Sequence, residues 1–185
     1  MLSSQFLKNF PALSAPEALL QLLDFDTHVA SRSYFAPGFE FKSPGPKFLL
    51  ETFSKDQRFL NHLHEFAQAD ASGSMYALWQ QEGTNDPEHS PIAVFGSEGG
   101  YHIVADNARE LLELLAADAE PMCSWEHVSY YRDPAEEASP LHAEYREWLR
   151  TNFAIERVRA ANEIVSTAQK IHQQAFVEWM KNFVE

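Results

Sequence analysis

Three short apolar runs in the middle of the chain constrain the fold more than any other feature. The runs are 75–80, 91–96 and 101–105. Each is apolar at successive positions, which is typical of strands that are covered on both faces. The break at Ser97-Glu98-Gly99-Gly100 is too short for a crossover helix, so the strands beside it must pair antiparallel. We expect the break at 81–90 to join neighbours as well, which predicts a three-stranded meander over about 75–105.

Amphipathic segments on both sides of the meander predict helices that pack on it. They are 14–23 continuing towards 29, 54–67 with Gln57 at its capping position, 108–115, a segment opening at 139–140, and 164–183. Ser14 with Glu17, and Asn107 with Glu110, have the spacing of helix caps. Segment 39–42 predicts a short edge strand, and 122–131 an extended one. The predicted class is α+β, with an antiparallel or mixed central sheet packed by flanking helices.

The length of the chain suits one domain. Its 185 residues, of which 45% are hydrophobic, supply enough apolar surface for one core. We expect a single domain over 1–185, with a helical segment at 1–70, a recognisable core at 75–116 and C-terminal helices at 139–184. The last helix is expected to dock within the chain; docking on a second copy is the alternative, so both a monomer and a homodimer stay open.

The charge balance is acidic and bears on the partners of the chain. Lys and Arg number 14 against 27 Asp and Glu, for a formal net charge of -13. Such a chain repels phosphate backbones, so we expect no nucleic-acid partner. A negative field would speed encounter with a basic protein. The simpler interpretation is that the charge keeps the protein in solution.

The single cysteine and the lack of long apolar runs limit the compartment. Cys123 has no second cysteine to form a disulfide or a thiolate metal site with. The longest apolar run near the N-terminus, 18–23, is too short for a membrane span, and Pro11 and Pro16 interrupt any signal-peptide pattern. We therefore expect a cytoplasmic protein without membrane association.

Sequence motifs that would indicate a phosphate-binding, metal-binding or catalytic site are weak. The glycine-rich 96–100 segment is not followed by Gly-Lys-Ser/Thr and leads into a strand, so a hairpin turn is favoured over a phosphate loop. Asp24 with His28 could share a helix face but has no third ligand. Glu98 with His102 suggests acid–base work only if geometry supports it. We expect no catalytic residues, no metal ligands and no cofactor.

Aromatic and acidic residues near the sheet are better candidates for protein recognition, because aromatic side chains are preferred anchors in interfaces. The candidate partner-binding residues are Trp79, Glu82, Asp86, Glu88, Glu98, Tyr101 and Trp125. The alternative for each aromatic residue is a place in the core.

The order of elements in the middle of the chain resembles the SUKH superfamily, also called the Knr/Smi-type domain. The residues that carry the resemblance are Tyr76 to Trp79, the Pro91-led run to Gly100, the strand ending in Val104-Ala105, and the leucines of 111–115. The match spans 75–116, whereas 37–46 departs from the family pattern. The resemblance implies an α+β fold without enzymatic activity, and many bacterial members are immunity proteins that neutralise a cognate toxin.

Three functions follow as hypotheses. The first is an immunity protein that binds a toxin, which can be a basic one. The second is an intracellular regulatory or adaptor domain that recognises a cellular partner. The third is an enzyme or small-ligand binder, which would require a deep polar pocket with a histidine and a carboxylate.

Overall fold

The central sheet is antiparallel throughout and follows the order of the chain. The computed structural model describes residues 3–11, 13–31 and 33–184. The five strands of this sheet have the order β1-β2-β3-β4-β5, and each pairs with the next. They are β1 Glu40–Phe41, β2 Leu63–Gln68, β3 Met75–Trp79, β4 Ile92–Phe95 and β5 Tyr101–Ala105. The predicted meander is β3, β4 and β5, and the α+β class with a central antiparallel sheet is confirmed.

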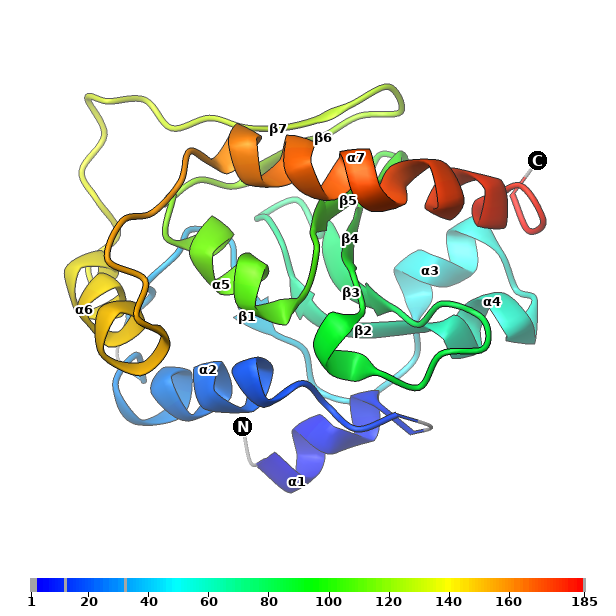
Figure 1. The fold of residues 1–185 in the computed structure, drawn as a ribbon, viewed down its shortest axis with the longest axis horizontal. Helices are drawn as coiled ribbons and strands as arrows, with labels where there is room; N and C mark the ends of the chain where they lie inside the picture. Colours follow the sequence, from blue (N-terminus) through cyan, green and yellow to red (C-terminus); the bar gives the residue numbers. More distant parts are fainter. Residues whose placement is uncertain (1–2, 12, 32, 185) are drawn as a thin grey trace.

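Helices surround this sheet, and a small hairpin lies beside it (Figure 1). The helices are α1 Ser3–Phe6, α2 Glu17–His28, α3 Phe48–Phe53, α4 Gln57–His62, α5 Ala108–Leu115, α6 His142–Phe153 and α7 Ala161–Met180, with short 3-10 turns η1 Leu7–Asn9 and η2 Pro87–His89. The hairpin pairs β6 Pro121–Cys123 with β7 Val128–Tyr130. In Figure 1, α7 runs beside β5, whereas α1 and α2 lie at the opposite side of the molecule.

Successive side chains of the central strands point to opposite faces of the sheet, which divides the core into two halves. Tyr76 and Leu78 of β3 face the half that contains residues of α2 and α5. Ala77 and Trp79 of the same strand face the half that contains Phe176 and other residues of α7. A fully buried large apolar side chain stabilises the fold by roughly 1.5–3 kcal/mol. The central strands are buried on both faces because helices cover both.

The helix predicted over 54–67 is wrong in its second half. Helix α4 ends at His62, and Leu63–Gln68 forms β2. Leu63, Phe66 and Ala67 have helical spacing, but pairing with β3 uses them in an extended conformation. A bulge between Glu65 and Ala67 shifts the register, so successive apolar side chains can be buried on either face. The first turn of the helix also differs, because Asp56 is its N-cap residue.

Two predicted helix caps have different outcomes. Asn107 caps α5 as expected: its Oδ1 accepts from the N–H of Glu110 at 3.0 Å. Ser14 does not cap α2, which starts after Pro16 without a cap from its own neighbourhood. The N–H of Glu17 donates instead to Oε1 of Glu88, at 2.8 Å. Glu88, from the distant β3–β4 loop, thus supplies the hydrogen-bond acceptor that the sequence pattern predicts for Ser14.

The C-terminal half confirms the favoured arrangement of the last helix. Helix α7 buries Ile164, Phe176 and Met180 within the chain. The extended segment predicted at 122–131 is the β6–β7 hairpin. Helix α6, which lies between this hairpin and α7, begins at His142, slightly after the predicted start at 139–140. Segment 39–42 contains β1, the short edge strand expected there.

Candidate functional site

The turn between β4 and β5 is a tight glycine turn. The N–H of Gly96 donates to the carbonyl of Gly100, and the N–H of Gly99 donates to the carbonyl of Gly96, both at 3.0 Å. Gly99 and Gly100 have φ of 105° and 84°, a region that other residues rarely adopt. The segment is followed by a strand, as predicted, and the hairpin assignment of 96–100 is confirmed.

The β6–β7 hairpin folds over this turn and brings Trp125 onto it. A Cβ added at Gly99 would lie 2.4 Å from Cε2 of the Trp125 ring. One added at Gly100 would lie 2.0 Å from the carbonyl oxygen of Ser124. Glycine is therefore needed at both positions for two reasons: the positive φ of the turn and the close approach of the hairpin. Trp125 rests against Gly99 but keeps 65% of its surface exposed.

Hydrogen bonds fix the tip of the hairpin. Oγ of Ser124 accepts from the N–H groups of Glu126 and His127, at 3.3 and 3.2 Å. Nε2 of His102 donates to the carbonyl of Ser124 at 2.7 Å. Burial lowers the pKa of His102, so its ring is neutral near pH 7 and holds one proton for this bond. Trp125 is thus an exposed aromatic residue on a rigid support.

Three of the sequence-predicted residues meet here. Glu98 projects from the glycine turn and is exposed, and Trp125 lies on the adjacent Gly99. Tyr101 is half-buried at the start of β5, with its ring 6.0 Å from that of Phe53, which also neighbours Trp125 at 6.4 Å. We call Glu98, Tyr101, Trp125 and the neighbouring exposed Met122 and Glu126 the hairpin-tip surface.

Three other candidates lie elsewhere. Glu82, Asp86 and Glu88 are exposed on the β3–β4 loop, and in an antiparallel meander this loop is at the opposite end of the strands from the glycine turn. Two of them have structural roles. Asp86 caps η2 and pairs with His89 at 2.8 Å, and Glu88 caps α2. The predicted residues therefore do not form one surface.

The prediction that Trp79 contributes to a binding surface is wrong. Only 3% of its surface is exposed. Its ring packs against Phe176 and Trp179 of α7, with centroid distances of 4.9 and 5.6 Å. The tryptophan ends its strand, where exposure is common, but a helix from far along the chain covers that end.

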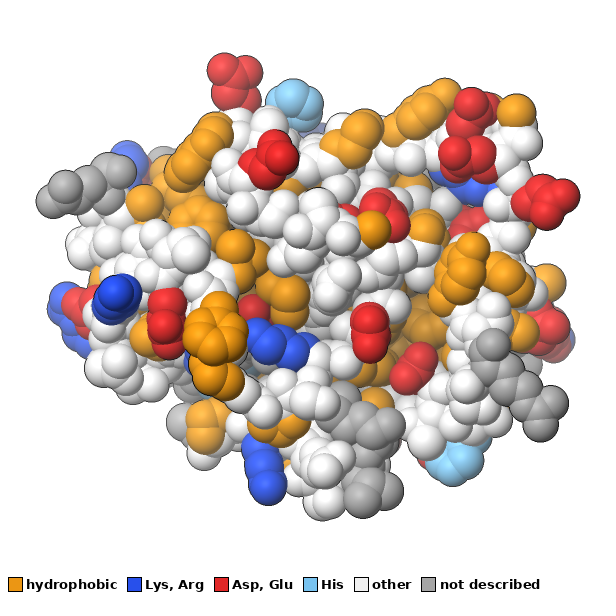
Figure 2. Space-filling model, turned by 180° about the vertical axis from the view of Figure 1, so that it is seen from behind, with side chains coloured by type: hydrophobic (Ala, Val, Ile, Leu, Met, Phe, Trp, Pro, Cys, Tyr) orange, Lys and Arg blue, Asp and Glu red, His pale blue; other side chains and the backbone are white. Residues whose placement is uncertain are grey.

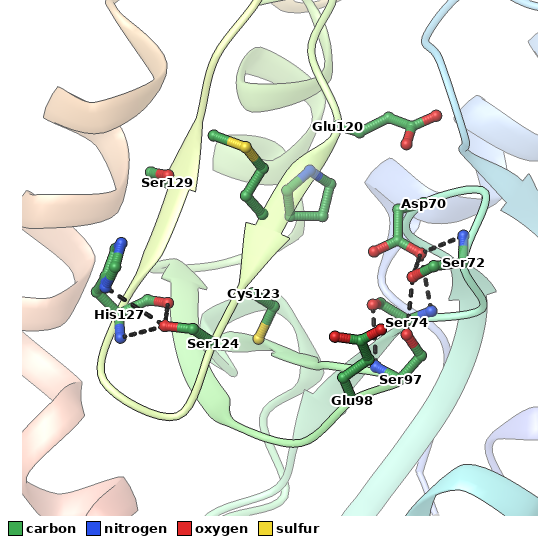
Figure 3. Close-up of a pocket in the computed structure, with 12 residues that line it drawn as sticks. Asp70, Ser72, Ser74, Ser97, Glu98, Glu120, Cys123, Ser124, His127 and Ser129 are labelled. Carbon is green, nitrogen blue, oxygen red and sulfur yellow. Dashed lines mark hydrogen bonds between the residues drawn. The ribbon is translucent and has the colours of Figure 1, made fainter.

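A polar pocket of about 460 Å³ opens beside the hairpin-tip surface (Figure 3). Two turns, β2–β3 and β4–β5, form one wall, and the β6–β7 hairpin forms the other. Its carboxylates belong to Asp70, Glu98 and Glu120, and its hydroxyls to Ser72, Ser74, Ser97, Ser124 and Ser129. We call it the serine pocket. Sequence reasoning found only Glu98 of these, although Asp70-Ala71-Ser72-Gly73-Ser74 has the composition of an aspartate-centred turn.

Two potential nucleophiles of this pocket, the Cys123 thiol and the Ser124 hydroxyl, are held in inactive forms. Burial and the charge of Asp70 raise the pKa of the Cys123 thiol to about 11, which keeps it protonated near pH 7. The hydroxyl of Ser124 lies 3.3 Å from Nδ1 of His127, but it also donates to the carbonyl of His127 at 3.0 Å and accepts two backbone N–H groups. These contacts serve the hairpin turn.

Comparisons with protein-family models, with curated proteins and with solved structures found no match to this chain. Within 3–11, 13–31 and 33–184, no group of three or more His, Cys, Asp or Glu side chains could hold a metal ion. No helix in the same part of the chain is both long and apolar enough to cross a membrane.

Proposed function

We propose that this chain is a protein-binding domain of the SUKH type, and that it neutralises a toxin by covering part of its surface. The observation that carries the proposal is Trp125, a large aromatic side chain that is 65% exposed yet held against Gly99 by a hydrogen-bonded hairpin. A rigid exposed tryptophan suits an interface because little conformational entropy is lost when it becomes buried.

Charge supports a basic partner. Glu126 follows Trp125 in the chain, Glu98 precedes the Gly99 on which Trp125 rests, and both glutamates are exposed. The chain as a whole carries a formal charge of -13. On the face shown in Figure 2, acidic side chains are spread more widely than Lys and Arg side chains. Complementary charge raises the rate of encounter and disfavours acidic competitors.

The resemblance to the SUKH superfamily supports the same function. The segment that carries it, 75–116, contains β3, β4, β5 and α5, a meander followed by a capped helix. Immunity proteins of that superfamily act by binding, which agrees with a site whose Cys123 thiol is protonated and whose Ser124 hydroxyl is engaged in the hairpin turn.

The test is co-expression with basic proteins encoded next to this chain's gene, followed by affinity purification and measurement of the dissociation constant. We expect one of them to be toxic alone and to form a complex with this chain. Trp125→Ala should weaken the complex by about 2 kcal/mol or more, roughly 30-fold. Tyr131→Ala is the matched control, since Tyr131 is equally exposed, at 65%, and lies outside the hairpin-tip surface. Rescue without a complex, or equal effects of both variants, would contradict the proposal.

A further inference from the structure

Helices α2 and α6 pack against each other and leave an open groove along their contact. The ring centroid of Phe25 on α2 lies 5.0 Å from that of Trp148 on α6 and 5.5 Å from that of Tyr145. Two cavities, of about 530 and 440 Å³, follow this contact, and Trp148 and Asn152 line both. We call the continuous depression the α2–α6 groove. In Figure 1 both helices lie at the lower left, away from the tip of the β6–β7 hairpin.

The floor of this groove is apolar and ordered. Trp148 is only partly buried, although its ring stacks on Tyr145 at 5.6 Å and meets Phe153 at 5.2 Å. Val29, directly after α2, keeps 48% of its surface exposed. A concave apolar surface whose side chains are already fixed is typical of a docking site. The apolar residues that line the groove are Leu20, Phe25, Val29, Ala143 and Trp148.

Exposed carboxylates border the groove on both helices. None of the described residues that line either cavity is a lysine or an arginine. Glu147 pairs with Arg150 at 2.5 Å, outside the groove lining. Glu88 adds a further exposed carboxylate where α2 begins, through its contact with the N–H of Glu17. The bordering carboxylates are Glu17 and Asp24 of α2 and Glu144 and Glu147 of α6.

We propose that the α2–α6 groove binds a basic amphipathic helix of another protein. Helices α2 and α6 have 12 residues each, so each is about 18 Å long and can support about three turns of a third helix. A helix docks in such a groove through one apolar stripe. Lysine and arginine side chains on both sides of that stripe would then meet the carboxylates of α2 and α6.

The charge of the groove decides between this occupant and a second copy of the chain. A second copy would bring acidic borders together, in a protein whose formal net charge is -13. A basic helix removes the same apolar surface from water and gains from the charges. The inference goes beyond the proposed function, because the groove is separate from the hairpin-tip surface and its occupant need not be the toxin.

The experiment is an NMR titration of the ¹⁵N-labelled protein with a synthetic amphipathic peptide of about 14 residues, which is about 21 Å long as a helix. It carries leucine on one face and lysine and alanine elsewhere. One control peptide has glutamate in place of lysine, and a second has the basic sequence scrambled so that no apolar face remains. We expect only the basic amphipathic peptide to shift the indole N–H signal of Trp148 and the amide signals of Val29 and Ala143. Equal shifts from a control peptide, or no shifts at these residues, would overturn the proposal.

A matched pair of variants tests the apolar floor. Val29→Lys places a cation in the groove at an exposed position and should weaken binding of the basic peptide at least about tenfold. Ile171→Lys is the control, because Ile171 is 59% exposed on α7, outside the groove, and the net charge changes equally. An equal loss in the two variants would show general charge attraction and reject the groove.

A second pair tests the acidic border. Glu144→Gln should weaken binding about two- to fivefold, since an exposed charge contributes modestly. Glu137→Gln removes the same charge from an exposed loop position and should have no effect. Equal effects of the two variants would contradict the role of the border.

The remaining outcomes separate this inference from the alternatives. A dimer of the unmodified chain in analytical ultracentrifugation that Val29→Lys dissociates would assign the groove to a second copy and overturn the proposal. A toxin complex that forms while the basic peptide fails to bind rejects the groove alone. Binding of the peptide in the groove, with no toxin complex from any neighbouring gene, rejects the toxin-neutralising function and leaves the groove assigned.

Discussion

Gln173 on helix α7 accepts a hydrogen bond from the backbone N–H of Ile103 in the edge strand β5, at 2.8 Å. One helical turn earlier, Gln169 donates its side-chain N–H to the carbonyl of the same residue, at 3.2 Å. Two glutamines thus bind the outward-facing backbone groups that a neighbouring strand would otherwise bind. Helix α7 closes this edge of the sheet with side chains, in addition to covering its face.

Gln173→Ala should destabilise the protein, because it leaves the buried N–H of Ile103 without an acceptor. The expected loss is about 1–3 kcal/mol in the free energy of unfolding, measured by urea denaturation. Gln174→Ala is the control, since Gln174 is exposed on the same helix. Its effect should stay within about 0.5 kcal/mol, and equal effects of the two variants would contradict the role of Gln173.

Gly99→Ala should cost more stability than Gly73→Ala. Both glycines have positive φ, 105° and 98°, so both substitutions strain the backbone by about 1–2 kcal/mol. A Cβ at Gly73 meets no atom within 4 Å, whereas one at Gly99 meets the Trp125 ring. Only Gly99→Ala should therefore also shift the indole N–H signal of Trp125 in an NMR spectrum. Equal costs, with Trp125 undisturbed, would contradict the packing of the hairpin on the turn.

Substitutions at Trp79 and Trp125 should separate an effect on stability from an effect on binding. Trp79→Ala removes a ring that is buried against α7 and should cost about 3–5 kcal/mol in thermal or urea unfolding. Trp125→Ala removes a mostly exposed ring and should cost less than about 1 kcal/mol. A large loss of stability in Trp125→Ala would show that this residue is structural and remove it as a recognition residue.

Glu113 should make stability depend on pH in the acid range. Burial acts to raise its pKa, but hydrogen bonds from the side chain and backbone of Arg159, together with its charge, outweigh burial and hold the pKa below the ordinary 4.5. A depressed carboxyl pKa stabilises the folded state above pH 4.5, and this contribution is lost as the pH falls through the folded-state value.

The corresponding measurement compares Glu113→Gln with the unmodified chain by urea unfolding between pH 7 and pH 3. The variant should be less stable at pH 7, and the gap should narrow as the pH falls. Glu147→Gln is the control, because the Glu147–Arg150 pair is exposed and should give no resolvable gap at either pH. A gap that persists unchanged at pH 3 would contradict the role of the Glu113 charge.

The meander could be predicted because the apolar pattern of its strands and the residues of its turns indicate the same structure. The run Ile92–Phe95 has apolar residues on both faces, and the glycines that follow it fit only a tight turn. The strand Leu63–Gln68 was not predictable in the same way. Its apolar residues also have helical spacing, and only pairing with β3, which tolerates a bulge, decides between the two conformations.

The candidate site was predicted in part. Glu98 and Trp125 were singled out as separate residues, but their proximity depends on Gly99 and Gly100, whose missing side chains let the hairpin approach. The serine pocket depends on three turns that are distant in the sequence. Trp79 was misassigned because its burial depends on Phe176 and Trp179, nearly a hundred residues later.

The two edge strands of the central sheet, β1 and β5, limit how another protein can dock. Strand β1, Glu40–Phe41, is only two residues long, and β5 is occupied by helix α7. The short β1 and the glutamines that bind Ile103 make both borders of the central sheet poor templates for an added β-segment. Selectivity must then come from side chains at the surface, where each can be exchanged without rebuilding the scaffold beneath.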